Sequence, residues 1–305
     1  MLEMLAHSNI LHHIIVESQL GLEVIILGLL RLSDMLSRRI EEFRSLITLL
    51  TTIPLGPGRL EDAARAFHLV PLIGLIVGVI VSSMLIVFKV LGVEPVLAGL
   101  LYVAIHTLVT GGLHLDGFAD YSDVIGSRAR GERALSILKD PRKGSFAVIL
   151  VAINIIASYS SSIAIYESIR WDYLKFTILT SSVIVLSYII AYEAMYLALF
   201  LGREEPYEGM AKVFSLEAKR RSIMDNLIPL AASMVIPVAG IAMVKPLVEA
   251  LTATIIILTL MIAIVVYVVR DSSNRIGFIN GDIAGFTYEL VRVLGLVALA
   301  IMISL

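Results

Sequence analysis

The chain has 305 residues, a net charge of −2 and no cysteine. Hydrophobic residues make up 58% of the chain and charged residues only 16%, with a mean hydropathy of +0.91. Soluble globular domains carry roughly a quarter charged residues, so this composition excludes an ordinary soluble domain and indicates a polytopic membrane protein. The absence of cysteine excludes disulfides, thiolate metal ligands and a cysteine nucleophile.

The first 36 residues differ from the rest and are expected to form an extension. They are only moderately apolar, and residues 10–32 predict an amphipathic helix at the membrane periphery. The alternative is a misassigned start, because the run from Met35 resembles a fresh N-terminus. Residues 37–305 are expected to form a single integral membrane catalytic domain.

Apolar runs long enough to cross a bilayer follow this extension. Residues 38–53 mix charged and apolar side chains at helical spacing before Pro54, which predicts one more interfacial helix. Seven transmembrane helices are then predicted, at about residues 69–91, 95–110, 146–166, 174–201, 223–244, 247–269 and 283–304. The glycine pair at 111–112 is expected to end the short second span. The predicted fold class is therefore an all-α membrane helical bundle.

Lysine and arginine are distributed unevenly between the two ends of these spans. If the spans alternate in direction, nineteen of these residues fall on the side that holds residues 111–145, and four fall on the other side. The positive-inside rule then places the first side in the cytoplasm of a cell membrane. The turn at residues 280–282 lies on that same side, far away in sequence.

Three carboxylates follow the glycine pair, at Asp116, Asp120 and Asp123. On a helix this spacing places them within an arc of about 60°. Carboxylates this close repel one another unless a cation lies between them, and Mg²⁺ prefers oxygen ligands and keeps waters for a substrate phosphate. The stripe therefore predicts a Mg²⁺ site, with a solvated acidic face as the alternative.

Cations that suit phosphate oxygens follow the stripe, at Arg128, Lys139, Arg142 and Lys143. Carboxylates that hold a metal, followed by cations that neutralise phosphate oxygens, are typical of phosphoryl transfer. The general base is expected to be His114 or a carboxylate that the metal does not fully engage. The alternative for His114 is a structural hydrogen bond.

Polar residues elsewhere have simpler interpretations. His106 and Asn154 lie within spans and are expected to make hydrogen bonds between helices. Glu193 also lies within a span, where an ionisable group is costly and often functional. The acidic residues at 204–208 are expected to form a solvated loop.

Two enzyme families share parts of this pattern. The spacing of Asp120, Asp123 and Arg128 resembles part of the signature of membrane CDP-alcohol phosphotransferases, but the later aspartates of that signature do not fit. The cobalamin synthase family, the adenosylcobinamide-GDP ribazoletransferases, is the stronger resemblance and covers roughly residues 40–290. The runs that carry it are TLLTTIP (48–54), PLIG (71–74) through Gly78, GGLHLDGFADYSD (111–123), LKDPRKG (138–144) and GDxAG (281–285).

This resemblance implies an activity and a site. Members of that family join adenosylcobinamide-GDP to α-ribazole or its 5′-phosphate, release GMP and require Mg²⁺. Catalytic roles are expected for Asp116 and Asp120 at this site and, as the candidate base named above, for His114. The resemblance implies a metal site at Asp116, Asp120 and Asp123 that Asp140 and Asp282 complete together with Arg142. The chain departs from the family pattern at Pro141, Ala147 and Asn280.

A protein of another class, an ion-coupled transporter, is the remaining alternative. Transporters hold charged sites near the midplane and often show paired repeats, whereas these carboxylates gather at the ends of spans and no repeat is evident. The expected partners are the two substrates and the lipid bilayer, with no nucleic acid. The sequence leaves open whether the chain forms a homo-oligomer.

Overall fold

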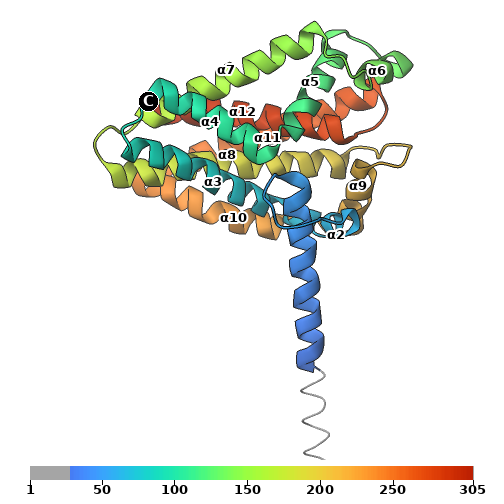
Figure 1. The fold of residues 1–305 in the computed structure, drawn as a ribbon, viewed down its shortest axis with the longest axis horizontal. Coiled ribbons are helices and arrows are strands. Elements are labelled where there is room, and N and C mark those ends of the chain that lie inside the picture. The colour runs from blue at the N-terminus through green and yellow to red at the C-terminus, as the bar shows by residue number, and fades with distance from the viewer. Residues whose placement is uncertain (1–27, 305) are drawn as a thin grey trace, which may run out of the picture.

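The computed structural model describes residues 28–304 of the chain (Figure 1). A helix covers residues 28–50. The helices after it are α2 (Leu60–Arg65), the 3₁₀ turn η1 (Phe67–Leu69), α3 (Val70–Val90), α4 (Pro95–Thr110), α5 (Leu113–Gly126), α6 (Gly131–Leu138), α7 (Ser145–Glu167), α8 (Tyr173–Leu201), α9 (Met210–Arg220), α10 (Ile223–Val244), α11 (Leu247–Arg275) and α12 (Gly281–Ser304). Within residues 28–304 there is no β-strand, so the predicted all-α fold is confirmed.

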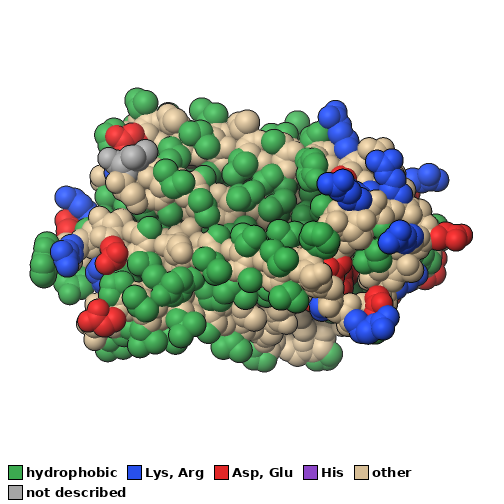
Figure 2. All heavy atoms as spheres, turned by 90° about the horizontal axis from the view of Figure 1, so that it is seen from above, with side chains coloured by type: hydrophobic (Ala, Val, Ile, Leu, Met, Phe, Trp, Pro, Cys, Tyr) green, Lys and Arg blue, Asp and Glu red, His purple; other side chains and the backbone are tan. Residues whose placement is uncertain are grey.

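Six of the described helices are long and apolar enough to cross a membrane, namely α3 with η1, α7, α8, α10, α11 and α12. The pair α4 and α5 passes the same test only together, which raises the number to seven. Figure 2 shows hydrophobic side chains over the middle of one face and charged side chains at its two ends, with lysine and arginine densest at the end that carries α6. An apolar middle between charged ends is the surface expected of a protein that crosses a bilayer.

A sharp bend separates α4 from α5. Gly111 and Gly112 both have left-handed backbone angles, with φ of 63° and 67°, which glycine adopts without steric cost. The two helices are bent by 96° at this point, so α5 runs across the long helices rather than along them (Figure 1). The glycine pair therefore ends helix α4, as predicted, while the end of a membrane span at this point stays a prediction.

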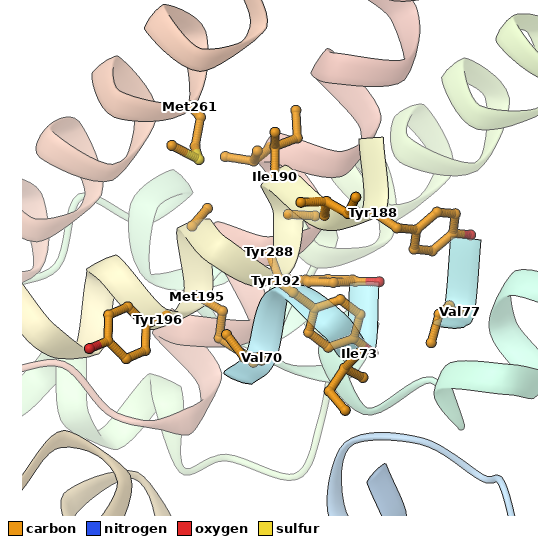
Figure 3. Packing of buried hydrophobic residues seen from close by; sticks show 14 of the residues in the cluster. Val70, Ile73, Val77, Tyr188, Ile190, Tyr192, Met195, Tyr196, Met261 and Tyr288 are labelled. Atoms are coloured by element: carbon orange, nitrogen blue, oxygen red, sulfur yellow. The ribbon is translucent and has the colours of Figure 1, made fainter. Parts of the chain in front are cut away.

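The core of the bundle is built around α8, which packs against α3, α10, α11 and α12. Figure 3 shows the tyrosines of α8 among side chains of α3, α11 and α12. Tyr188, Tyr192 and Tyr196 are fully buried, and the ring of Tyr192 meets that of Tyr288 from α12 edge-on at 4.7 Å. This packing fixes α12, which carries Asp282 in its first turn, against the centre of the protein.

A buried polar network joins four helices in the middle of the bundle. The guanidinium of Arg292 donates to Glu289 Oε2 at 2.7 Å and to Asn154 Oδ1 at 3.0 Å. His106 Nε2 lies 3.1 Å from Glu289 Oε1, and the hydroxyl of Tyr188 lies 2.8 Å from His106 Nδ1. The predicted interhelical hydrogen bonds of His106 and Asn154 are therefore confirmed, with a buried ion pair at their centre.

The N-terminal helix lies apart from this core. Residues 28–40 are exposed, and the helix runs across the long helices and away from the bundle (Figure 1). A helix before Pro54 is confirmed and ends at residue 50, while its place at the membrane interface stays a prediction. Of the predicted peripheral helix at residues 10–32, all but residues 28–32 lies outside the described residues. The boundary between extension and catalytic domain also stays a prediction.

The buried ion pair generates a stability prediction. Glu289→Gln leaves the Arg292 charge in a water-free interior without its counter-charge, so we expect a loss of roughly 3–5 kcal/mol of stability. The matched control is Glu217→Gln, which removes the partner of the largely exposed Arg220 and should cost about 0–1 kcal/mol. Thermal unfolding in detergent measures both, and equal melting temperatures for the two variants would contradict the role given to the pair.

Candidate active site

The predicted acidic stripe lies on α5, and its members differ in exposure. The side chain of Asp116 is 67% exposed and that of Asp120 is 12% exposed, while Asp123 is buried. All three contact the segment that runs from Lys143 into the first turn of α7. The helix and the shared face are as predicted, and the stripe runs from solvent into the protein.

The cation between the first two carboxylates is the ammonium of Lys143. Its Nζ lies 2.8 Å from Asp116 Oδ1 and 2.5 Å from Asp120 Oδ1. Partial burial alone would lower the pKa of Lys143, but the hydrogen bonds and charges of Asp116 and Asp120 outweigh it and raise the pKa. Lys143 therefore stays charged, and the carboxylates of Asp116 and Asp120 reach the same ammonium group, which marks a common cation point between them.

The third carboxylate, Asp123, is engaged by the backbone of α7. The N–H of Gly144 donates to Asp123 Oδ2 at 2.6 Å, and the N–H of Ala147 donates to Oδ1 at 2.9 Å. The N-terminus of a helix carries unpaired N–H groups and a partial positive charge, which a carboxylate satisfies. Both oxygens of Asp123 are thus used in capping α7, while its predicted metal ligation stays a prediction.

Asp282, from the far end of the sequence, lies against the same helix. A Cβ on Gly117 would come within 2.7 Å of the Asp282 carbonyl oxygen, so α5 and the start of α12 touch backbone to backbone. The Asp282 carboxylate accepts a hydrogen bond from Asn280 Nδ2 at 2.8 Å. The structure therefore brings the first turn of α12 against α5 between Asp116 and Asp120, near enough for their charges to act on Asp282, and the predicted shared side of the spans is confirmed for these segments.

The loop between α8 and α9 adds two residues that the sequence did not indicate. The N–H of Ile279 donates to the carbonyl of Arg203 at 2.8 Å, which ties this loop to the turn before α12. Glu205 is only 4% exposed, and burial together with the charge of Asp282 raises its pKa. Tyr207 packs edge-on against Phe278 at 5.6 Å.

The prediction of a solvated acidic loop is therefore wrong for Glu205. Its side chain folds back over Gly209 and accepts a hydrogen bond from the N–H of Lys212 at 3.2 Å. The only sequence signal was an aromatic residue, Tyr207, in an otherwise charged loop, and no periodicity marks such a position.

The predicted phosphate-binding cations lie in different settings around this region. Lys139 lies over the ring of Tyr207, 4.5 Å from its centre. Arg142 is 87% exposed and pairs with Asp140 at 2.8 Å, and its hydrogen bond lowers the pKa of the Asp140 carboxyl to about 2. Arg128 is exposed at the left-handed turn after α5. The Asp140 carboxylate is thus paired with Arg142, its neighbour in the same loop, and its predicted part in the metal site stays a prediction.

His114 lies on the opposite side of α5 from Asp116. It is 3% exposed, and its ring lies 4.2 Å from that of Tyr288 and 5.7 Å from that of Tyr192. Among the described residues, no group forms a hydrogen bond with His114 Nε2. The imidazole therefore faces the aromatic core of the bundle, and its predicted catalytic role stays a prediction.

A comparison with known protein families identifies the chain. The profile of a family described as cobalamin-5-phosphate synthase matches residues 42–300. The chain belongs to this family. The resemblance carried by the acidic stripe and its neighbouring runs is thereby confirmed, and with it membership of an enzyme family.

Individual relatives agree along most of the chain. A protein of Clostridium perfringens is 29% identical over 261 residues, which is 84% of this chain and 95% of the relative. One of Lachnoclostridium phytofermentans is 27% identical and covers 83% and 88% of the two chains. A third, from Geotalea daltonii, is 36% identical but covers only 39% of this chain and 47% of its own. Each is named adenosylcobinamide-GDP ribazoletransferase, and no solved structure matches the chain.

The capping contacts of Asp123 generate a second prediction. Asp123→Ala leaves two N–H groups of α7 without an acceptor, so we expect a loss of about 1–2 kcal/mol of stability and faster amide exchange at Gly144 and Ala147. The control is Asp116→Ala on the same helix, where a mostly exposed ion pair is worth about 0–1 kcal/mol. Melting temperature and hydrogen exchange in detergent measure this, and a smaller loss for Asp123→Ala than for Asp116→Ala would refute the capping role.

Proposed function

We propose that this protein transfers the adenosylcobinamide phosphate group from adenosylcobinamide-GDP to α-ribazole or its 5′-phosphate. The products are GMP and adenosylcobalamin or its 5′-phosphate. The observation that carries this proposal is the common point shared by Asp116 and Asp120, beside Asp282, in a chain of the cobalamin-5-phosphate synthase family. The names of its relatives support the choice of substrates.

We propose Mg²⁺ as the metal, held by Asp116 and Asp120. Mg²⁺ is usually bound through one or two carboxylates together with substrate phosphates, rather than in an all-protein cage. Asp116 and Asp120 suit this mode of binding, because both carboxylates reach one cation. Within residues 28–304 no three acidic or histidine side chains are arranged to hold a metal without the substrate. When bound, the ion would neutralise charge on the diphosphate oxygens.

The chain's own residues would then position the diphosphate. Lys143 would exchange its carboxylate partners for phosphate oxygens, and Lys139 lies at the edge of the same region. The acceptor hydroxyl attacks the phosphorus bonded to the cobinamide oxygen, a new O–P bond forms, and the bond to the bridging oxygen breaks to release GMP. No covalent enzyme intermediate is needed, so positioning and charge neutralisation supply most of the acceleration.

The proton of the attacking hydroxyl needs an acceptor. We propose Asp282 for this role, because its backbone touches α5 at Gly117, its carboxylate is near enough to feel the charges of Asp116 and Asp120, and that carboxylate receives a side-chain hydrogen bond from Asn280. His114 suits the role less well, because its ring is enclosed by Tyr192 and Tyr288 on the other side of α5.

One assay tests this function. The purified protein in detergent, given adenosylcobinamide-GDP, α-ribazole and Mg²⁺, should release GMP and form a cobalamin in equal amounts. Removal of Mg²⁺ by a chelator should stop the reaction, and re-addition should restore it. A parent protein that forms no cobalamin from either acceptor would overturn the proposal.

The same assay tests the carboxylates. Asp116→Asn removes a ligand charge with almost no change in volume, so we expect turnover to fall by at least about a hundredfold while the melting temperature stays close to that of the parent. Glu217→Gln, which removes the charge of the partner of the largely exposed Arg220 with little change in volume, serves as the control and should keep full turnover. Parental turnover by a folded Asp116→Asn variant would exclude Asp116 as a ligand.

We also propose that the site faces the cytoplasm, as the distribution of lysine and arginine indicates. The chain has no cysteine, so single cysteines can report orientation. In intact cells, Glu167→Cys should react with a membrane-impermeant thiol reagent and Ser136→Cys should react only after permeabilisation, because they lie at opposite ends of the bundle. The reverse pattern of labelling would invert the orientation.

A further inference from the structure

An apolar groove opens directly beside the acidic site. It has a volume of about 460 Å³ and lies between α5 and α7. Its charged end is formed by Asp116 and Lys143, the same pair that marks the common cation point. Its walls are apolar, formed by Leu115 and Ala119 of α5 and by Val148, Val151, Ala152 and Ile155 of α7.

Small residues on both helices line the hollow. Ala119 and Ala152 present only a methyl group where larger side chains on the same helices would fill the space. Apart from Asp116 and Lys143, every side chain on the walls lacks a hydrogen-bonding group. A ligand here would therefore be apolar along its body and polar at one end, where it meets the reacting phosphates.

The size of the groove separates the substrates of the proposed reaction. A volume of 460 Å³ lies within the roughly 300–1,000 Å³ of pockets that hold small organic ligands. A corrin ring with its amide side chains is larger than this space and far more polar than these walls. The guanosine of the donor carries polar edges that Leu115 and Val151 cannot satisfy, and burying them unpaired is costly. The acceptor, by contrast, carries a bicyclic aromatic base whose rim is hydrocarbon.

We infer that this groove is the subsite for the aromatic base of the acceptor nucleoside, with the base between Leu115 and Val151 and the ribose at Asp116 and Lys143. This inference rests on the proposed function. In this position the ribose hydroxyl is next to the carboxylates that hold the diphosphate, and the base lies against the membrane-spanning part of α7. The groove would then select apolar benzimidazole-type bases over purines, because a purine would leave its ring nitrogens unpaired.

The test fills the groove without touching the charged end. Ala152→Phe places a ring between α5 and α7, and we expect KM for α-ribazole to rise about tenfold or more while KM for adenosylcobinamide-GDP stays within about twofold. A riboside of unsubstituted benzimidazole, which is smaller, should be affected less than α-ribazole. The control is Ile156→Phe, an exposed position on α7 outside the groove, which should leave both KM values unchanged.

A second variant and a binding measurement keep the test decisive. Leu115→Ala enlarges the groove, so it should weaken α-ribazole but admit a riboside with a larger, naphthalene-fused base. Titration calorimetry with α-ribazole alone should show binding to the parent and a loss of at least about tenfold in affinity with Ala152→Phe. Equal changes in KM for both substrates, or no change for either, would overturn the inference. A turnover rate that depends on the acyl-chain length of added lipid in the parent but not in Ala152→Phe would also overturn it, because the groove would then hold lipid.

These outcomes separate the two proposals. If the parent forms cobalamin and Ala152→Phe behaves like the parent, the groove assignment fails and the proposed function stands. If the parent binds α-ribazole but forms no cobalamin, and Ala152→Phe abolishes that binding, the proposed function fails and the groove stands. A parent that neither binds α-ribazole nor forms cobalamin overturns both.

Discussion

Repulsion among carboxylates on one face of α5 is the constraint that organises this end of the protein. Asp116, Asp120 and Asp123 lie on successive turns, and each needs positive charge close by. The loop into α7 supplies it in two forms, as the Lys143 ammonium for the first two and as the N-terminus of α7 for the third. The packing of α5 against α7 is therefore electrostatic at its charged end and apolar beyond it.

Two other features hold α5 in the orientation that this contact requires. The left-handed glycines before it bend the chain by 96°, so that α5 and its carboxylates run across the long helices and not along them. The absence of a side chain at Gly117 lets α12 approach, with Asp282 at its first turn. Two turns further along, the buried Glu289–Arg292 pair of α12 bonds to Asn154 of α7 and His106 of α4. Asp282 is thus placed by a helix that cannot slide without breaking these buried interhelical hydrogen bonds, which suits a group that must keep its distance to a reacting atom.

Much of this arrangement follows from the sequence, because it rests on local rules. Span lengths follow from apolar runs, the end of α4 follows from the glycine pair, and the stripe follows from helical spacing. The meeting of Asp282 with α5 follows from alternation of the spans. Each of these inferences needs only the period of a residue pattern, the length of an apolar run or the sign of a charge.

What the sequence did not yield depends on tertiary contacts between loops. Asp140 pairs with Arg142, and Asp116 pairs with Lys143, because of the way the turn at residues 139–144 folds. The sequence alone does not distinguish these two adjacent cations. To predict that Asp123 caps α7, one would need to know that Gly144 lies beside Asp123 in the fold. Glu205 is buried because the turn at residues 276–280 pairs with its loop, a contact between segments with no periodicity of their own.

The position of α5 across the bundle also explains how one small site can hold chemically opposite groups. Its exposed end carries charges in contact with water, and its neighbouring side chains, with those of α7, form an apolar wall within the membrane-spanning part of the fold. A helix parallel to the long axis would spread its three carboxylates over about 10 Å along that axis. Turned across that axis, it keeps charge at one level and leaves the apolar depth of α7 free beside it. The proposed reaction joins a charged diphosphate to a nucleoside with an apolar base, so it needs both environments within the span of one ribose, and the bent α4–α5 pair provides them.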